Sequence, residues 1–292
     1  MDIRGSMVAL ITPFTDAGGV DEEALRRLVE FHVEQGSHAL VPCGTTGESA
    51  TLTHEEHREV IRIVVEQAAG RIPVIGGTGS NSTAESIELT RYAKEVGCDA
   101  ALLISPYYNK PSQDGVYLHY KRIAEETAFP LIVYNVPGRT ALNILPETVA
   151  RLARVPGIVG IKEATANLQQ IAEVIDATPE GFALISGDDA TTFPTLCLGG
   201  VGTISVVANV APRDMAALCD AWFAGEVEEA RRLHYRTLPL SKVLFIETNP
   251  VPVKEACHLL GFCRPHLRLP LTRLAEANRE RLRAALADYG LL

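Results

Sequence analysis

Residues 130–161 read PLIVYNVPGRTALNILPETVARLARVPGIVGI and contain the pattern from which the fold can be predicted. It opens with an apolar run at 130–134, and it closes with a second apolar run at 158–161. Between the two runs, Pro146 and Glu147 mark a helix start, because proline is favoured in the first helical turn. Two buried strands joined by a helix form a βαβ unit, in which the strands are parallel.

The same unit recurs along the whole chain, at a spacing of about 25 to 30 residues. Apolar runs occur at 7–12, 39–43, 73–76, 100–105, 130–134, 158–161, 183–186 and 203–207. Helix-start signals at 21–23, 53–56 and 82–85 lie between them. Eight units close a barrel, so we predict an α/β protein with a (β/α)8 TIM-barrel fold. An open doubly wound sheet is the alternative, but its GxGxxG signature is absent.

A long segment follows the eighth apolar run and is helical in pattern. The patterns lie at 213–223, 227–245, 253–260 and 272–287, with a break at 248–252. The first completes the eighth unit, and the others predict a C-terminal helical extension. We therefore expect a catalytic barrel over residues 1–224 and an extension over residues 225–292.

The composition excludes several classes of protein. The chain has 292 residues and carries 27 Lys+Arg against 36 Asp+Glu, a net charge of −9, which disfavours nucleic acid and anionic membranes as partners. No apolar stretch is long enough to cross a bilayer, and the N-terminus lacks the basic start of a signal peptide. We expect a cytoplasmic protein with free thiols. The cluster Cys257, His258, Cys263 and His266 matches no zinc spacing, so we expect no metal.

Reactive groups in such barrels come from the carboxyl ends of the strands, where this chain carries unusual residues. The second apolar run is followed by Gly44-Thr45-Thr46-Gly47-Glu48, whose hydroxyls and backbone N–H groups could hold an anion. Tyrosines follow the fourth run, at 107 and 108, and Tyr134 ends the fifth. The phenol groups could transfer protons.

Lys162 directly follows the sixth run, and it decides the chemistry. A lysine that follows apolar strand residues projects into a water-poor barrel mouth, where its amine can become neutral and nucleophilic. The alternative is a lysine paired with Glu163 or another acid. Together with the phenols and the threonine loop, an amine nucleophile indicates a Schiff-base lyase or aldolase that acts on an α-keto acid.

These residues resemble the pyruvate-dependent class I aldolases of the N-acetylneuraminate lyase and dihydrodipicolinate synthase type. The resemblance extends over nearly the whole chain and rests on 44–48, Tyr134-Asn135 and Gly160-Ile161-Lys162. The stretches 107–111 and 134–140, above all Arg139, favour the synthase branch. It implies that pyruvate forms an imine with Lys162 and then attacks L-aspartate 4-semialdehyde, giving 4-hydroxy-tetrahydrodipicolinate without a cofactor.

The resemblance also implies roles for other residues. We expect Thr45, Tyr134 and Tyr108 to relay protons. Tyr108 is expected to reach the site from the neighbouring subunit of a tight dimer. We expect two such dimers to form the homo-oligomer, a dimer of dimers. The expected substrate-binding residues are Thr46, Arg139, Gly187 and Ile204. The expected allosteric site for lysine, a feedback inhibitor, consists of Ser49, Ala50, His54, His57, Asn81, Glu85 and Tyr107.

Two alternatives to this function stay open. One is another pyruvate aldolase of the same family, which cleaves N-acetylneuraminate or a 2-keto-3-deoxy sugar acid; Arg139 disfavours it. The other is a catalytically silent barrel that only senses lysine, which the intact set of Lys162, Tyr134 and Thr45 disfavours.

Overall fold

The computed structural model describes residues 3–292 and contains one eight-stranded sheet in that range, in the order β2-β1-β8-β7-β6-β5-β4-β3. Parallel ladders join β1 to β2, and they join each neighbouring pair from β3 to β8. An isolated parallel bridge links Leu40 of β2 to Val74, directly before β3. This strand order and the parallel pairing are those of a (β/α)8 barrel, so the predicted fold class is confirmed.

The strands are short and buried. They are β1 (Gly5–Ala9), β2 (Ala39–Val41), β3 (Ile75–Gly77), β4 (Ala100–Ile104), β5 (Leu131–Asn135), β6 (Ile158–Glu163), β7 (Ala183–Ser186) and β8 (Gly202–Ser205). All eight coincide with predicted apolar runs. The first strand is displaced towards the N-terminus, because Ile11 donates its backbone N–H to the side-chain oxygen of Asn209, at 3.1 Å, instead of continuing the ladder.

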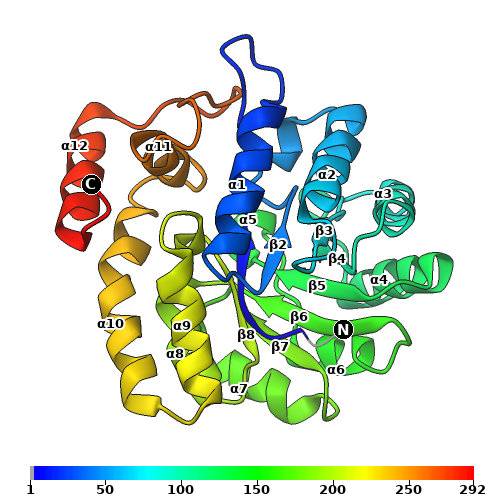
Figure 1. Ribbon diagram of the computed structural model, residues 1–292. Helices are drawn as coiled ribbons and strands as arrows, with labels where there is room; N and C mark the ends of the chain where they lie inside the picture. Colours follow the sequence, from blue (N-terminus) through cyan, green and yellow to red (C-terminus); the bar gives the residue numbers. More distant parts are fainter. Residues whose placement is uncertain (1–2) are drawn as a thin grey trace. The chain divides into compact units, whose positions relative to one another are not determined.

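By its contacts the chain divides into two compact units. The first consists of residues 75–204 together with residues 3–5. Its helices are α3 (Thr83–Glu95), α4 (Gln113–Thr127), α5 (Pro137–Thr140), α6 (Pro146–Leu152), α7 (Leu168–Ala177) and α8 (Thr192–Cys197). In this unit α3 packs against α4, and α6 packs against α7 (Figure 1).

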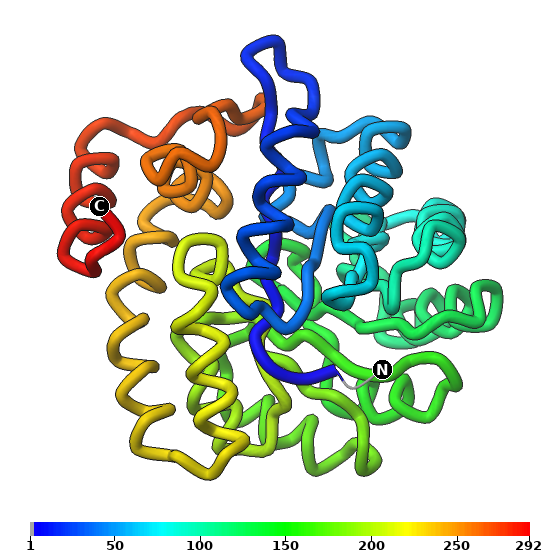
Figure 2. Tube along the Cα trace, viewed as in Figure 1, coloured from blue at the N-terminus to red at the C-terminus, as the bar shows by residue number. Residues whose placement is uncertain are grey.

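The second unit consists of residues 6–74 and 205–292. Its helices are α1 (Glu22–Glu34), α2 (His54–Ala68), α9 (Pro212–Phe223), α10 (Val227–Val243), α11 (Val251–Leu259) and α12 (Glu276–Tyr289). Figure 2 shows α9 and α10 side by side, in yellow and orange, followed by α11 and α12 near the C-terminus. The predicted C-terminal helices are therefore present, while the boundary between residues 224 and 225 stays a prediction.

The starts of the helices follow the sequence signals. Thr53 and Glu56 form a reciprocal capping box at the start of α2, and Ser82 caps α3. Pro146 lies in the first turn of α6. Within residues 3–292 no helix is long and apolar enough to cross a membrane.

Candidate active site

Lys162 lies near the carboxyl end of β6 and is only 6 % exposed. In the parallel register it neighbours Tyr134 of β5 on one side and Ile185 of β7 on the other. Gly160 allows β6 and β7 to approach closely, since a Cβ at this position would lie 2.5 Å from the carbonyl oxygen of Ala183. The apolar residues of β6 that precede Lys162 thus place its amine in the buried interior.

The surroundings of Lys162 favour the neutral amine. Burial lowers its pKa from the ordinary 10.5 to about 8, because the ammonium loses its hydration. The negative charge of Asp189 opposes this shift, and the positive charge of Arg139 adds to it. A larger share of the amine is therefore unprotonated near neutral pH, as a nucleophile requires.

Tyr134 lies against this amine. The Nζ atom of Lys162 is 4.4 Å from the centroid of the Tyr134 ring, and the tyrosine is 7 % exposed. The backbone carbonyl of Tyr134 accepts a hydrogen bond of 2.9 Å from the backbone N–H of Ser105, directly after β4. The structure therefore brings together the amine and the phenol that the sequence places at the ends of two strands.

The turn after β7 supplies two further neighbours of Lys162. A Cβ at Gly187 would lie 2.6 Å from the Cβ of Ala164 and 3.0 Å from the Cε of Lys162, so only glycine leaves room for the lysine side chain. Asp189 is 6 % exposed and begins the short helix η2 (Asp189–Thr191). Sequence reasoning missed Asp189, for which the only signal was its place just after a strand end.

The alternative to a reactive amine is a lysine paired with Glu163 or another acid, and of these acids Glu163 does not pair with Lys162. Successive side chains of a strand point to opposite faces, so Glu163 points away from the side that carries the lysine. Its carboxylate accepts hydrogen bonds from the side-chain amides of Asn135 and Gln170 and from the backbone N–H of Thr165. These bonds satisfy the carboxylate without a lysine.

Arg139 belongs to α5, a helix of four residues that the sequence did not predict. Pro137 begins it, and Ala141 ends it in the left-handed conformation with φ 55°. The arginine side chain is exposed. Ile204, another predicted substrate contact, is buried in β8. The structure thus places Arg139 within electrostatic reach of Lys162, while the substrate roles of both residues stay predictions.

Thr45 and Thr46 lie in the loop after β2, in the second unit. Internal bonds shape the loop: the backbone N–H of Gly47 donates to the carbonyl of Gly44, and that of Glu48 donates to the carbonyl of Thr45, both at 3.1 Å. The side chain of Asn249 donates to the Thr46 hydroxyl at 2.9 Å. The loop is therefore held in one conformation, and the roles of both threonines stay predictions.

A buried ion pair anchors the same loop. Glu48, in the left-handed conformation with φ 54°, accepts a hydrogen bond from the ammonium of Lys254 in α11. The side chains of this pair are 1 % and 0 % exposed, respectively. The Lys254 ammonium also lies 3.9 Å from the centroid of the Phe14 ring. Opposite charge and a ring face together compensate the burial of both groups.

The predicted lysine-binding positions fall into both units. In the second unit, Ser49 and Ala50 begin the short helix η1 (Ser49–Thr51), and His54 and His57 lie in the first turn of α2. His57 is buried and His54 is exposed. The structure thus clusters these four positions along two consecutive helix starts.

The remaining predicted lysine-binding positions belong to the first unit. The side-chain amide of Asn81 donates to the carbonyl of Tyr107 at 3.3 Å, so these two positions are brought together. Glu85 accepts a hydrogen bond from the hydroxyl of Ser80. Next to this group, Tyr108 is 91 % exposed and adopts φ 69°. Such a side chain is available to a neighbouring subunit, which stays a prediction.

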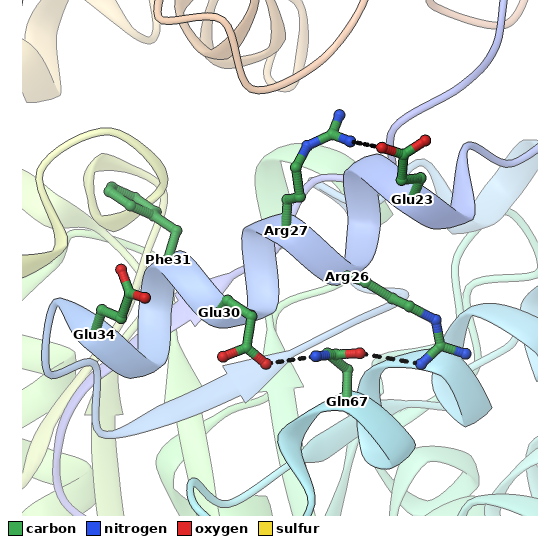
Figure 3. A pocket seen from close by; sticks show the side chains of 7 residues that line it. All are labelled: Glu23, Arg26, Arg27, Glu30, Phe31, Glu34 and Gln67. Atoms are coloured by element: carbon green, nitrogen blue, oxygen red, sulfur yellow. Dashed lines mark hydrogen bonds and ion pairs between the residues drawn. The ribbon is translucent and has the colours of Figure 1, made fainter.

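Two other features lie in the second unit. The thiols of Cys257 and Cys263 each donate to a backbone carbonyl, and residues 3–292 contain no group of three potential metal-binding side chains. Figure 3 shows a surface pocket over α1 in which Gln67 bridges Arg26 and Glu30. Its lining residues are Glu23, Arg26, Arg27, Glu30, Phe31, Glu34 and Gln67.

Comparisons with known proteins agree with this geometry. The model of the dihydrodipicolinate synthetase family matches residues 2–289. The 4-hydroxy-tetrahydrodipicolinate synthase of Geotalea uraniireducens is 58% identical over 289 residues, which cover 99% of each chain. The dihydrodipicolinate synthase of Acinetobacter baumannii, crystallised with pyruvate, superposes with a TM-score of 0.98 at 50% identity, covering 99% of this chain and 100% of the other. The dihydrodipicolinate synthase of Cyanidioschyzon merolae, crystallised with lysine bound, superposes with a TM-score of 0.95 at 42% identity, and the match covers 99% of each chain.

Proposed function

Because the chain belongs to the dihydrodipicolinate synthetase family, we infer that it is a lyase with 4-hydroxy-tetrahydrodipicolinate synthase activity. It condenses pyruvate with L-aspartate 4-semialdehyde in the route to diaminopimelate and lysine. The observation that carries this proposal is the buried amine of Lys162, whose pKa is lowered to about 8 beside the Tyr134 phenol. Such an amine can act as a nucleophile without a separate base.

In the first step, the neutral amine of Lys162 attacks the keto carbon of pyruvate. The carbonyl oxygen leaves as water, and an imine forms between Nζ and the former keto carbon. Loss of a proton from the methyl group gives an enamine, whose carbon attacks the aldehyde carbon of the semialdehyde. Ring closure by the semialdehyde amine releases Lys162 and gives the cyclic product. The covalent imine serves in place of a cofactor, and we propose that no metal takes part.

Proton transfers in these steps need groups that both accept and donate. We propose Tyr134, Thr45 and Tyr108 for this relay, with Tyr108 contributed by a neighbouring subunit. The closeness of Tyr134 to Nζ of Lys162 supports its part, and the 91 % exposure of Tyr108 supports the donation across an interface. The enzyme would then act as a tight dimer, and two such dimers would form a dimer of dimers. In each subunit, we propose a catalytic barrel over residues 1–224 and a helical extension over residues 225–292.

The two substrates are anions, and we propose local groups that hold them. The backbone N–H of Thr46 would bind the pyruvate carboxylate, and the Arg139 guanidinium would bind that of the semialdehyde, a task for which its planar pair of donors is suited. Gly187 leaves space beside the Lys162 side chain, and the carbonyl of Ile204 would face the substrate. We also propose that the enzyme works in the cytoplasm.

We propose lysine as a feedback inhibitor that binds Ser49, Ala50, His54, His57, Asn81, Glu85 and Tyr107. The lysine-bound structure of the Cyanidioschyzon merolae enzyme supports this site class. A carboxylate, an amide and hydroxyls are suitable partners for the two ammonium groups of lysine.

Reduction by borohydride in the presence of pyruvate, followed by peptide mass mapping, tests the chemistry. We expect a pyruvyl adduct on Lys162 and none in a Lys162→Arg variant. An adduct on another lysine, or no adduct, would refute the Schiff-base step. Turnover of pyruvate with aspartate semialdehyde, compared with cleavage of N-acetylneuraminate, tests the substrate; faster cleavage of the sugar acid would overturn the synthase assignment.

A further inference from the structure

Behind Lys162 and Tyr134, on the opposite face of the two strands, lies a buried polar cluster that the proposed reaction does not use. In the ladder between β5 and β6, Tyr134 pairs with Lys162 and the next position pairs Asn135 with Glu163. Side chains alternate along a strand, so this second pair lies on the other face. Asn135 is 0% exposed and Glu163 is 1% exposed, which makes the carboxyl a costly group to bury.

Three donors surround the Glu163 carboxyl group. Its Oε2 atom accepts from the side-chain amides of Asn135, at 2.9 Å, and Gln170, at 3.2 Å. Its Oε1 atom accepts from the backbone N–H of Thr165 at 2.9 Å. All three donors are uncharged, so no cation fixes this carboxyl group from these positions. The group joins β5, the end of β6 and the helix α7, which carries Gln170.

Asn135 has every polar group of its side chain in use. Its amide nitrogen donates to Glu163 and, at 2.8 Å, to Asn143, while its oxygen accepts from the backbone N–H of Ile144 at 3.0 Å. Asn143 and Gln170 in turn donate to each other, at 2.8 and 3.1 Å. A closed network of this kind fixes each member, because a buried donor left without an acceptor is costly.

The network reaches the reacting residues through the backbone. Glu163 adjoins Lys162, and Asn135 adjoins Tyr134, so fixing one pair of side chains fixes the strand ends that carry the other pair. The carbonyl of Glu163 also accepts from the backbone N–H of Gly187 at 2.7 Å, next to the space that Gly187 leaves for Lys162. A displacement of the strand ends would therefore change the placement of Nζ against the Tyr134 ring.

We propose that Glu163 is a positioning residue for the reaction: through Asn135 it holds the ends of β5 and β6 in the register that places Lys162 against Tyr134. This rests on the proposed function, in which those two residues act on pyruvate. Glu163 itself touches no reacting atom. Its effect is expected in the rate of imine formation more than in substrate affinity, because catalytic geometry is sensitive to shifts of about 1 Å, which can cost about a hundredfold.

The first test is Glu163→Gln in the full chain, compared with Glu173→Gln, which replaces an exposed glutamate of α7 in the same helix layer. The side-chain amide of the introduced glutamine would point its N–H groups at the N–H donors of Asn135 and Gln170. We expect kcat and the rate of imine formation on Lys162 to fall at least about tenfold, with KM for pyruvate changed less than about threefold. The control variant Glu173→Gln should match the wild type in kcat and in the rate of imine formation.

The second test exchanges the two groups. In Glu163→Gln/Asn135→Asp the carboxylate moves to β5, and the amide at position 163 can donate to it, so the link between the strands is restored. We expect this double variant to recover at least about threefold in kcat over Glu163→Gln. Gln170→Met removes a single donor from α7 without altering either strand, and should lower kcat by less than Glu163→Gln does.

The outcomes separate this inference from the proposed function. Thermal unfolding of each variant shows whether it folds; where Glu163→Gln does not, the double variant and Gln170→Met decide. If the folded variants form the imine at the wild-type rate, the positioning role is wrong. It is also wrong if the double variant regains the thermal stability of the wild type but its kcat does not rise above that of Glu163→Gln. If wild-type protein gives no adduct on Lys162, the proposed function fails instead.

Discussion

The pH dependence of imine formation tests the central electrostatic feature of the site. Burial lowers the pKa of Lys162 to about 8. At pH 7 about one amine in ten is then neutral, against about one in 3,000 for an ordinary lysine of pKa about 10.5. The lowered pKa therefore increases the reactive fraction about 300-fold, equivalent to about 3 kcal/mol. We expect the rate with subsaturating pyruvate to rise about tenfold per pH unit and to level off above about pH 8.

The assay separates imine formation from the reduction that traps it. Enzyme and pyruvate react at each pH for a set time and are then diluted into borohydride at one fixed alkaline pH, so that trapping is the same throughout. Mass spectrometry of the intact protein gives the fraction that carries the adduct. A rate that still rises steeply at about pH 10 would refute the argument, because Lys162 would then titrate like an exposed lysine.

Two substitutions should move the midpoint in opposite directions. Asp189→Asn removes a negative charge that raises the pKa of Lys162, so the midpoint should fall. Arg139→Gln removes a positive charge that lowers the pKa, so the midpoint should rise. Glu173→Gln, on the exposed face of α7, is the matched control and should leave the midpoint in place. Shifts of the same sign in the two active-site variants would contradict the electrostatic account.

Three further predictions concern stability and regulation. Lys254→Met leaves the carboxylate of Glu48 buried without its cation, and should lower the free energy of unfolding by about 3–5 kcal/mol in urea titrations, with more than half recovered in Lys254→Met/Glu48→Gln. Burial lowers the pKa of His32 to about 3, so between about pH 6.5 and 3 only the unfolded chain binds this proton. The stability of the wild type should therefore fall with decreasing pH by about 1.4 kcal/mol per unit more than that of His32→Gln. Lysine should inhibit the wild type, and His57→Ala or Glu85→Ala should raise the concentration needed for half inhibition; a wild-type rate unaffected by millimolar lysine would refute the regulatory site.

The repeated pattern predicted the barrel because hydrophobic burial sets both the strands and their spacing. The short elements at the strand ends were beyond that reasoning. The helix α5 has four residues, too few to show a helical period, and it forms because Pro137 starts it and Ala141 can end it in a left-handed conformation. Likewise, the end of β1 depends on Asn209, a residue far along the chain whose side chain takes the ladder's place at Ile11.

The buried position of Lys162 at the end of β6 was predictable because an ionisable group after an apolar strand is unusual in itself. Its neighbours were not equally visible. Asp189 acts on Lys162 through its charge, which requires the turn after β7 to bring it near the end of β6. Glu163 was visible as a possible partner of Lys162, yet the alternation of side chains turns it to the other face, where amides bind it. Sequence adjacency therefore suggested an ion pair that strand geometry forbids.

The net charge of −9 says little about how this enzyme handles anionic substrates, because the charges that govern Lys162 are few and close. Asp189 and Arg139 act on the amine with opposite signs, and burial outweighs both. An incoming carboxylate would add a negative charge and favour the unreactive ammonium. A guanidinium within electrostatic reach of the amine offsets that effect. Arg139 would thus serve the reactivity of Lys162 towards pyruvate first and, once the imine has formed, the capture of the semialdehyde carboxylate.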